Sequence, residues 1–250
     1  MTHDYDAYPT LEVAMSHKYR GHDIRDWEEW RAKHAYPSAA AIPDGADKAM
    51  IGRNRDTASL RSKQFLRHLI VADCDQAMLD AIGELANLTR LELEWPTLAG
   101  NLSPLTRLAK LRFLSIDSPR KVEDFALLAQ LPALRTLMVT NAKHLSDLDW
   151  LSGANHLEVI GIEGSINTAQ RITSLAPLAG LSGMEAFFGT SLRLIDKDLM
   201  PLAQCPRLKF ISIARVAKKP VFDALREARP DVTCGWFADR MWGKAGLRAA

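Results

Sequence analysis

Apolar residues recur along most of this chain in a six-residue pattern whose first, fourth and sixth positions are nearly always apolar. Successive copies of the pattern begin at Leu66, Leu88, Leu111, Leu134, Leu157, Met184 and Leu208. The steps between copies are 22, 23, 23, 23, 27 and 24 residues, which is far too regular for chance. Self-similarity at this period is typical of repeat architectures, in which each repeat is one structural unit stacked on the next.

The spacing inside the pattern predicts a short strand. The fourth and sixth residues are two apart, so a strand points both side chains to the same side. The first residue enters the same interior from the bend before the strand. One such unit cannot bury its apolar face alone, so we expect the units to stack and to form a parallel sheet over a shared core.

A second apolar group lies in the latter half of each unit, as at Leu102, Leu105 and Leu108. This group predicts a short helical or 3₁₀ turn on the side of the unit opposite the strand. The 27-residue step has room for a few extra residues, which we expect to bulge from the rim at 165–171.

The pattern L-x-x-L-x-L at this period resembles the leucine-rich repeat family, and the units are similar to the short bacterial subclass typified by internalins. The resemblance covers residues 65–214 and extends more loosely to residue 234. It implies an α/β fold, a right-handed solenoid with a parallel β-sheet on its concave face and short helices or 3₁₀ turns on its convex face. The family's asparagine at the ninth position is mostly absent, and only Cys74 is an accepted substitute. We therefore expect a less regular ladder of hydrogen bonds at the turns.

The repeat divides the chain into three segments. Residues 1–64 lack it and are expected to form an N-terminal cap segment. Residues 65–234 are expected to form a solenoid of seven or eight repeats, and residues 235–250 a C-terminal cap or tail. Within the first segment, residues 23–31 predict a short helix with Asp23 as its N-cap.

A stack of repeats has two open apolar ends that need covering. The candidates are four aromatic residues outside the main repeats, Trp27, Trp30, Trp236 and Trp242. In the alternative interpretation, the basic and aromatic C-terminal tail is a docking peptide or a helix that lies on a membrane surface.

Composition narrows the classes of function. The 250 residues are 47% hydrophobic and 25% charged, which is ordinary for a globular protein. The net charge of +2 gives no electrostatic reason to expect nucleic acid or a membrane surface as the partner. Three widely spaced cysteines argue against a disulfide framework and favour a reducing compartment. No secretory signal or membrane-spanning run is visible, so we expect a cytoplasmic protein.

Binding residues are expected on the concave face, at strand positions whose side chains point away from the core. Glu92, Glu94, Asp117 and Glu163 form an acidic strip on this face, with a tryptophan beside it and two apolar residues in the middle of the strands. This composition is typical of a protein-binding site, and the acidic strip favours a partner with a basic patch. A random polar assortment on the exposed strands is the alternative interpretation. The candidate binding residues are Glu92, Glu94, Trp95, Arg112, Asp117, Arg135, Met138, Asn141, Glu163 and Phe188.

Signals of catalysis are weak. The chain contains none of the nucleophile-elbow, phosphate-loop, zinc-protease or paired C-x-x-C motifs. His17 and His22 are expected to be solvated rather than to bind a metal. Cys74 lies between two aspartates, which disfavour the reactive thiolate. We therefore expect no catalytic residue, no metal and no cofactor.

Together these inferences predict a protein–protein interaction module without enzymatic activity. Adaptor and toxin-neutralising (immunity) roles in a bacterium fit the resemblance. The alternative is a secreted bacterial effector that acts on a host protein. The sequence leaves the partner and the oligomeric state open.

Overall fold

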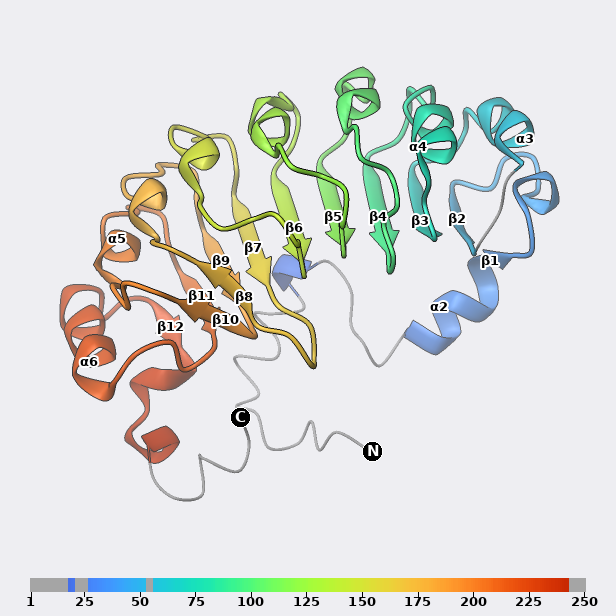
Figure 1. Cartoon of the computed structure of the whole chain (residues 1–250). Helices are drawn as coiled ribbons and strands as arrows, with labels where there is room; N and C mark the ends of the chain where they lie inside the picture. Colours follow the sequence, from blue (N-terminus) through green and yellow to red (C-terminus); the bar gives the residue numbers. More distant parts are fainter. Residues whose placement is uncertain (1–17, 21–26, 53–55, 243–250) are drawn as a thin grey trace.

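The computed structural model describes residues 18–20, 27–52 and 56–242, and these form one curved parallel sheet backed by short helices (Figure 1). The ten strands lie in the order β1-β2-β3-β4-β5-β6-β7-β9-β11-β12, and every neighbouring pair is parallel. Their bounds are β1 Ala35–Tyr36, β2 Lys48–Ile51, β3 His68–Ala72, β4 Arg90–Glu94, β5 Phe113–Asp117, β6 Thr136–Thr140, β7 Val159–Glu163, β9 Ala186–Gly189, β11 Phe210–Ile213 and β12 Thr233–Cys234. The predicted leucine-rich-repeat solenoid is confirmed.

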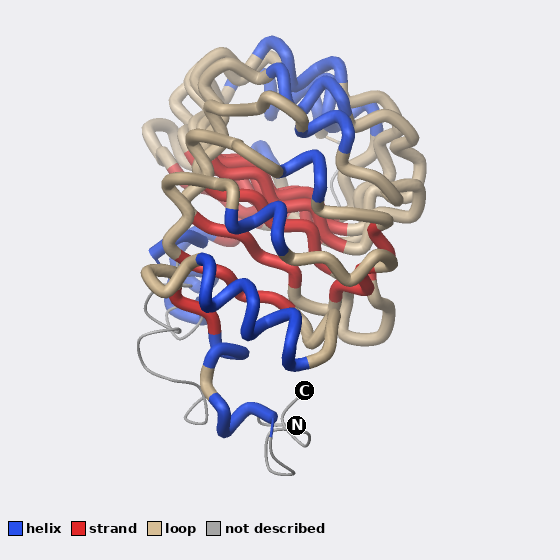
Figure 2. The backbone as a smooth tube through the Cα atoms, turned by 90° about the vertical axis from the view of Figure 1, so that its left-hand side faces the viewer, coloured by secondary structure: helices blue, strands red, loops and turns tan. Residues whose placement is uncertain are grey.

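Short helices and 3₁₀ turns form the convex side, as the second apolar group of each unit predicts, whereas α2 lies on the concave side and η8 and η9 lie at the C-terminal end. The α-helices are α2 Trp27–His34, α3 Thr57–Ser62, α4 Gln76–Ile82, α5 Met200–Ala203 and α6 Lys219–Ala228. The 3₁₀ turns are η3 Ala39–Ala41, η4 Ser103–Arg107, η5 Ala126–Gln130, η6 Asp149–Leu151, η7 Ala176–Leu178, η8 Gly235–Phe237 and η9 Asp239–Trp242. Figure 2 views the coil from its C-terminal end, with the strands stacked one behind another. None of the described helices is long and apolar enough to cross a membrane.

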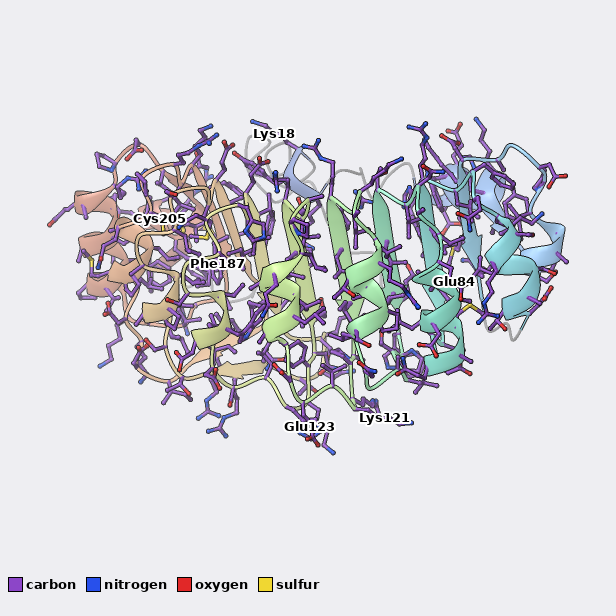
Figure 3. All side chains as sticks on the ribbon, turned by 90° about the horizontal axis from the view of Figure 1, so that it is seen from above. Lys18, Glu84, Lys121, Glu123, Phe187 and Cys205 are labelled. Atoms are coloured by element: carbon purple, nitrogen blue, oxygen red, sulfur yellow. The ribbon has the colours of Figure 1, made fainter. Side chains whose placement is uncertain are left out.

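The core lies between the sheet and the convex turns. The fourth residues of the repeats pair in exact register across the sheet, from Leu69 to Ile211, and they are fully buried. Phe187 takes the leucine position in β9, and Figure 3 shows it inside the body of the coil. Because every unit contributes to one continuous apolar interior, each strand is stabilised by its two neighbours rather than by its own unit.

Several of the turns that follow the strands contain a residue with a positive backbone φ angle. Asp73, Ser118, Asn141 and Ser191 each follow a strand with a positive φ of 50–55°. A left-handed residue turns the chain out of the sheet, and Asp and Asn tolerate this conformation better than most residues. These positions shape the backbone at the edge of the sheet.

The missing asparagine ladder is replaced at one turn by a glutamine from the next repeat. The backbone N–H of Ala142 donates to Oε1 of Gln170 at 2.8 Å, and Nε2 of Gln170 donates to the carbonyl of Leu145 at 2.6 Å. Gln170 is 6% exposed, so its amide satisfies buried backbone groups as the family's asparagine would. At this turn, a glutamine amide therefore takes the place of the asparagine.

The 27-residue step contains a bulge and a second, small sheet. Residues following β7 include Ile166, which is 92% exposed. The chain then returns through β8 Gln170–Ile172, which pairs in parallel with β10 Leu192–Leu194. The extra residues therefore project after the strand, at the rim.

The two ends of the coil differ. At the C-terminal end, Trp236 packs against Trp242 with 5.2 Å between ring centroids, and its Nε1 donates to the carbonyl of Ile213 at 2.7 Å. These tryptophans cover that end of the core. At the other end, β1 and β2 continue the sheet into the segment that the sequence sets apart as a cap. Helix α2 was expected at 23–31 with Asp23 as N-cap; its described part is Trp27–His34, and Asp23 lies outside the described residues.

Candidate functional site

The concave wall is formed by strand residues that alternate with the buried ones. Three columns of side chains point outward, because strand side chains alternate with a period of two. The first, second and third columns lie one residue before, one residue after and three residues after each buried fourth position. The first column consists of the residues just before each buried fourth position, and it contains none of the ten binding residues predicted from the sequence. Its members pair in register and are His68, Arg90, Phe113, Thr136, Val159, Ala186 and Phe210. Alternation counted outward from the buried leucines would have found them.

The ten predicted residues do not form one patch. Arg112 and Arg135 precede their strands, which start at Phe113 and Thr136, and so lie on what we call the entry edge. Arg112 is exposed. Arg135 donates to the carbonyl of Leu134 at 2.8 Å and has its Nε 3.8 Å from Oε1 of Glu158. These two arginines therefore lie at the opposite end of the strands from Glu94, Asp117 and Glu163.

The opposite, exit edge is where the strands end, and it carries Trp95, Asp117 and Asn141. Asn141 donates through Nδ2 to Oγ of Ser118 at 2.9 Å, so its side chain joins two turns together. The side chain of Trp95, by contrast, is 61% exposed. The exit edge thus combines turn residues with one accessible aromatic ring.

Glu92 is held by its neighbours within the wall. Its Oε1 lies 2.9 Å from Nε2 of His68 and 2.8 Å from Nε of Arg90. Burial would raise the pKa of Glu92, but the hydrogen bond to His68 and the charge of Arg90 outweigh burial and lower the pKa to about 2. Arg90 in turn lies over the ring of Phe113, with its Cζ 3.5 Å from the centroid. Glu92 is therefore an internally paired group.

Glu94 and Asp117 form the accessible part of the acidic strip. Burial and the charges of Glu92 and Asp117 raise the pKa of Glu94, which the charge of Arg31 opposes. Burial also raises the pKa of Asp117, against the hydrogen bond that it accepts from Ser118. Together with Trp95, these two carboxylates make up what we call the exit-edge patch.

Glu163 is paired with a residue 143 positions earlier in the chain. Arg20 donates from Nη2 to Oε1 of Glu163 at 2.7 Å, and the hydroxyl of Thr190 donates to the same oxygen. Glu163 is 4% exposed, whereas the side chain of Arg20 is 31% exposed. The acidic strip therefore ends in a partly buried ion pair rather than in an open carboxylate.

The expected exposure of Met138 and Phe188 is wrong, because residues 18–20 lie across the concave wall. Tyr19 stacks on Phe210 with 6.0 Å between centroids, and the guanidinium of Arg20 lies 4.4 Å from the ring centroid of Phe188. Met138 is 4% exposed and Phe188 is fully buried. Figure 1 shows this short blue stretch on the inner side of the arch. Removing aromatic rings from water is favourable, and residues 18–20 provide this burial for Phe188 and Phe210.

Helix α2 covers the other end of the wall. The ring of Trp30 lies 5.0 Å from that of His68 and 5.6 Å from that of Trp27. These two tryptophans were expected to cover an end of the solenoid, and the structure places Trp30 against the first outward column instead. Residues of the N-terminal segment therefore contact the concave wall at two places.

The cysteines lie in the core. Burial and the charge of Asp75 raise the pKa of Cys74 to about 12, and burial raises that of Cys205. Cys205 donates through Sγ to the carbonyl of Leu178 at 3.1 Å. The described residues contain no cluster of three side chains arranged to bind a metal; His17 and His22 lie outside them.

Comparison with known proteins gives the fold. No protein-family model and no curated protein matches the sequence significantly. Among solved structures, an internalin (InlF) of Listeria monocytogenes is similar with a TM-score of 0.51 and 22% identity, over 66% of this chain and 47% of that one. Internalin C2 (InlC2) of the same organism gives a TM-score of 0.45 and 18% identity, over 73% of this chain and 92% of the other. The chain thus spans about half the length of InlF and has the leucine-rich-repeat solenoid fold.

Proposed function

We propose that this protein is a non-enzymatic interaction module that binds a protein partner through its concave face and exit edge. The observation that carries the proposal is Trp95, a large aromatic side chain that is 61% exposed and directly follows Glu94 in the chain. Tryptophan is enriched among the residues that contribute most to protein–protein binding. An aromatic centre with a charged surround is typical of such interfaces.

The charge of the exit-edge patch indicates the kind of partner. Burial raises the pKa of both Glu94 and Asp117, so the surroundings of each carboxylate disfavour its charged form. A partner with a basic patch would stabilise both carboxylates, whereas the phosphates of nucleic acid would be repelled. Within this class we place adaptor and toxin-neutralising roles, because each needs only a large complementary face.

Quantitative affinity capture tests the assignment. Wild-type protein and the Trp95→Ala variant are used as baits in a lysate of the source cells, and captured proteins are compared by mass spectrometry. The matched control is Met200→Ala, which removes an exposed apolar side chain (38% exposed) from α5 on the convex side. We expect a partner that is retained by wild type and the control and falls at least about tenfold on Trp95→Ala, as a hot-spot residue requires. Equal retention by all three baits would refute the exit-edge assignment.

A further inference from the structure

The two residues that cover the concave wall cross its three columns in order. Tyr19 stacks on Phe210, which is in the first column, and Arg20 lies over Phe188, which is in the second. The guanidinium then reaches Glu163 at the end of β7, in the third column. Figure 3 places Lys18 at the long edge of the coil opposite Lys121 and Glu123, so the segment enters from the entry edge. A short peptide can thus lie across the strands here.

The wall makes separate contacts with the aromatic ring, the guanidinium and the backbone of the dipeptide formed by Tyr19 and Arg20. The aromatic ring packs in a cluster that also includes Met138, Val159 and Ala186. The guanidinium finds a carboxylate that is 4% exposed together with the face of an aromatic ring, the two groups that arginine binds best. Arg90 donates from Nη2 to the backbone carbonyl of Arg20 at 3.1 Å. This last contact holds the peptide backbone and is available to any chain in the same position.

The chain's own dipeptide fits this site imperfectly. The hydroxyl of Tyr19 is buried and has no hydrogen-bond partner among the described residues. A phenylalanine would fill the same space without burying a polar group. The side chain of Arg20 remains 31% exposed, and residues 18–20 pair with no strand of the sheet. An outside segment with better chemistry can therefore compete for the site.

The geometry points to a peptide-recognition site on the concave wall, lined by Met138, Glu163, Phe188 and Phe210, for a partner segment in which an aromatic residue, best phenylalanine, is followed by arginine. The chain's own Tyr19 and Arg20 occupy this site and must leave before the partner binds. The inference rests on the proposed function and adds the partner's chemistry. It does not depend on the exit-edge patch.

The test uses the full-length chain and labelled peptides read by fluorescence anisotropy. The double variant Tyr19→Ala/Arg20→Ala opens the wall, and the probe is a peptide with the sequence of residues 15–23. A linked segment competes at an effective concentration in the millimolar range, so we expect the open variant to bind the probe about 100-fold more tightly than wild type if the probe's own Kd is about 10 µM. A probe with phenylalanine in place of the tyrosine should bind a few-fold more tightly, and one with alanine in place of the arginine at least about tenfold more weakly.

A variant of the wall identifies the site. In the open background, Glu163→Gln should reduce probe binding at least about tenfold. The matched control is Glu158→Gln, which removes a carboxylate at the entry edge near Arg135 and should leave binding unchanged. If the double variant does not fold, as judged by circular dichroism, Arg20→Gln alone replaces it. Tyr19 then still protects the rings from water, but the segment loses its ion pair with Glu163, so the probe should displace it and bind more tightly than to wild type.

Several outcomes would overturn the inference. The first is that the probe does not bind the folded open variant, and the second is that wild type and the open variant bind it equally. The third is that Glu163→Gln and Glu158→Gln reduce probe binding equally. A wild-type dimer that the open variant does not form would assign the site to a second copy of this chain, again overturning the partner proposal. These results leave the exit-edge capture experiment untouched, so failure of the peptide site and failure of the proposed function are distinguishable.

Discussion

The pairing of Glu92 predicts that this carboxylate stabilises the fold above acidic pH. Its side chain is 15% exposed, and its pKa lies at about 2 rather than at 4.5 because His68 and Arg90 hold the charged form against the effect of burial. The difference between these two pKa values corresponds to about 3 kcal/mol. Because the pKa is lower in the folded state, the unfolded chain binds more protons at low pH. The stabilisation is therefore complete above about pH 4.5 and is lost as the pH falls towards about 2.

The substitution Glu92→Gln removes this titration. We expect the free energy of unfolding of the wild type to fall by about 2 to 3 kcal/mol more than that of the variant between about pH 7 and pH 2.5. Urea titrations at several pH values across this range measure the difference. Glu84→Gln removes an exposed carboxylate that pairs with Arg61 and controls for the loss of one charge. Parallel pH profiles of wild type and Glu92→Gln would refute the reasoning, because the pairing would then contribute nothing to the difference between folded and unfolded states.

Three further predictions concern the core, an end of the coil and the covering segment. Leu137→Ala empties a fully buried position in β6 and should lower the free energy of unfolding by about 2 to 5 kcal/mol in urea titrations, whereas a change below about 1 kcal/mol would mean that the core collapses around it. Trp236→Phe loses the hydrogen bond to the carbonyl of Ile213 and should cost about 1 to 3 kcal/mol; an unchanged thermal midpoint would contradict the covering role of this ring. Tyr19→Phe removes a buried hydroxyl without a partner among the described residues and should stabilise the covered wall by about 1 kcal/mol, which weakens binding of the 15–23 peptide to the otherwise wild-type chain about fivefold. Tighter peptide binding by this last variant would show that the buried hydroxyl does not destabilise the covered wall.

The covered wall changes how the acidic strip is understood. Four carboxylates lie along it in the sequence pattern, but Glu92 and Glu163 are each paired with arginine within the chain. Of these four, Glu94 and Asp117 remain to attract a partner, and both belong to the exit-edge patch. A partner with a basic patch would therefore meet the protein first at the exit edge, and the recognition site under residues 18–20 would be reached by displacement.

The sequence by itself determined the repeat, the parallel strands and the inward-facing residues. This succeeded because the pattern is local: strand alternation and a period of 22 to 27 residues decide which side chains of each unit point inwards. Leu69, Leu91 and Leu114 lie in register for this reason, and no distant residue could change it. The expected projection after β7 follows from the one long step in the same way.

Only the tertiary structure decided which outward side chains are accessible. Met138 and Phe188 occupy the same strand position as the partly exposed Ser115 and Ser212, yet a segment more than a hundred residues away in the chain buries them. The pairing of Arg20 with Glu163 spans 143 positions and leaves no periodic trace in the sequence. Contacts of this kind depend on the curvature that brings the wall and the N-terminal segment together, and curvature is a property of the assembled stack rather than of any one repeat.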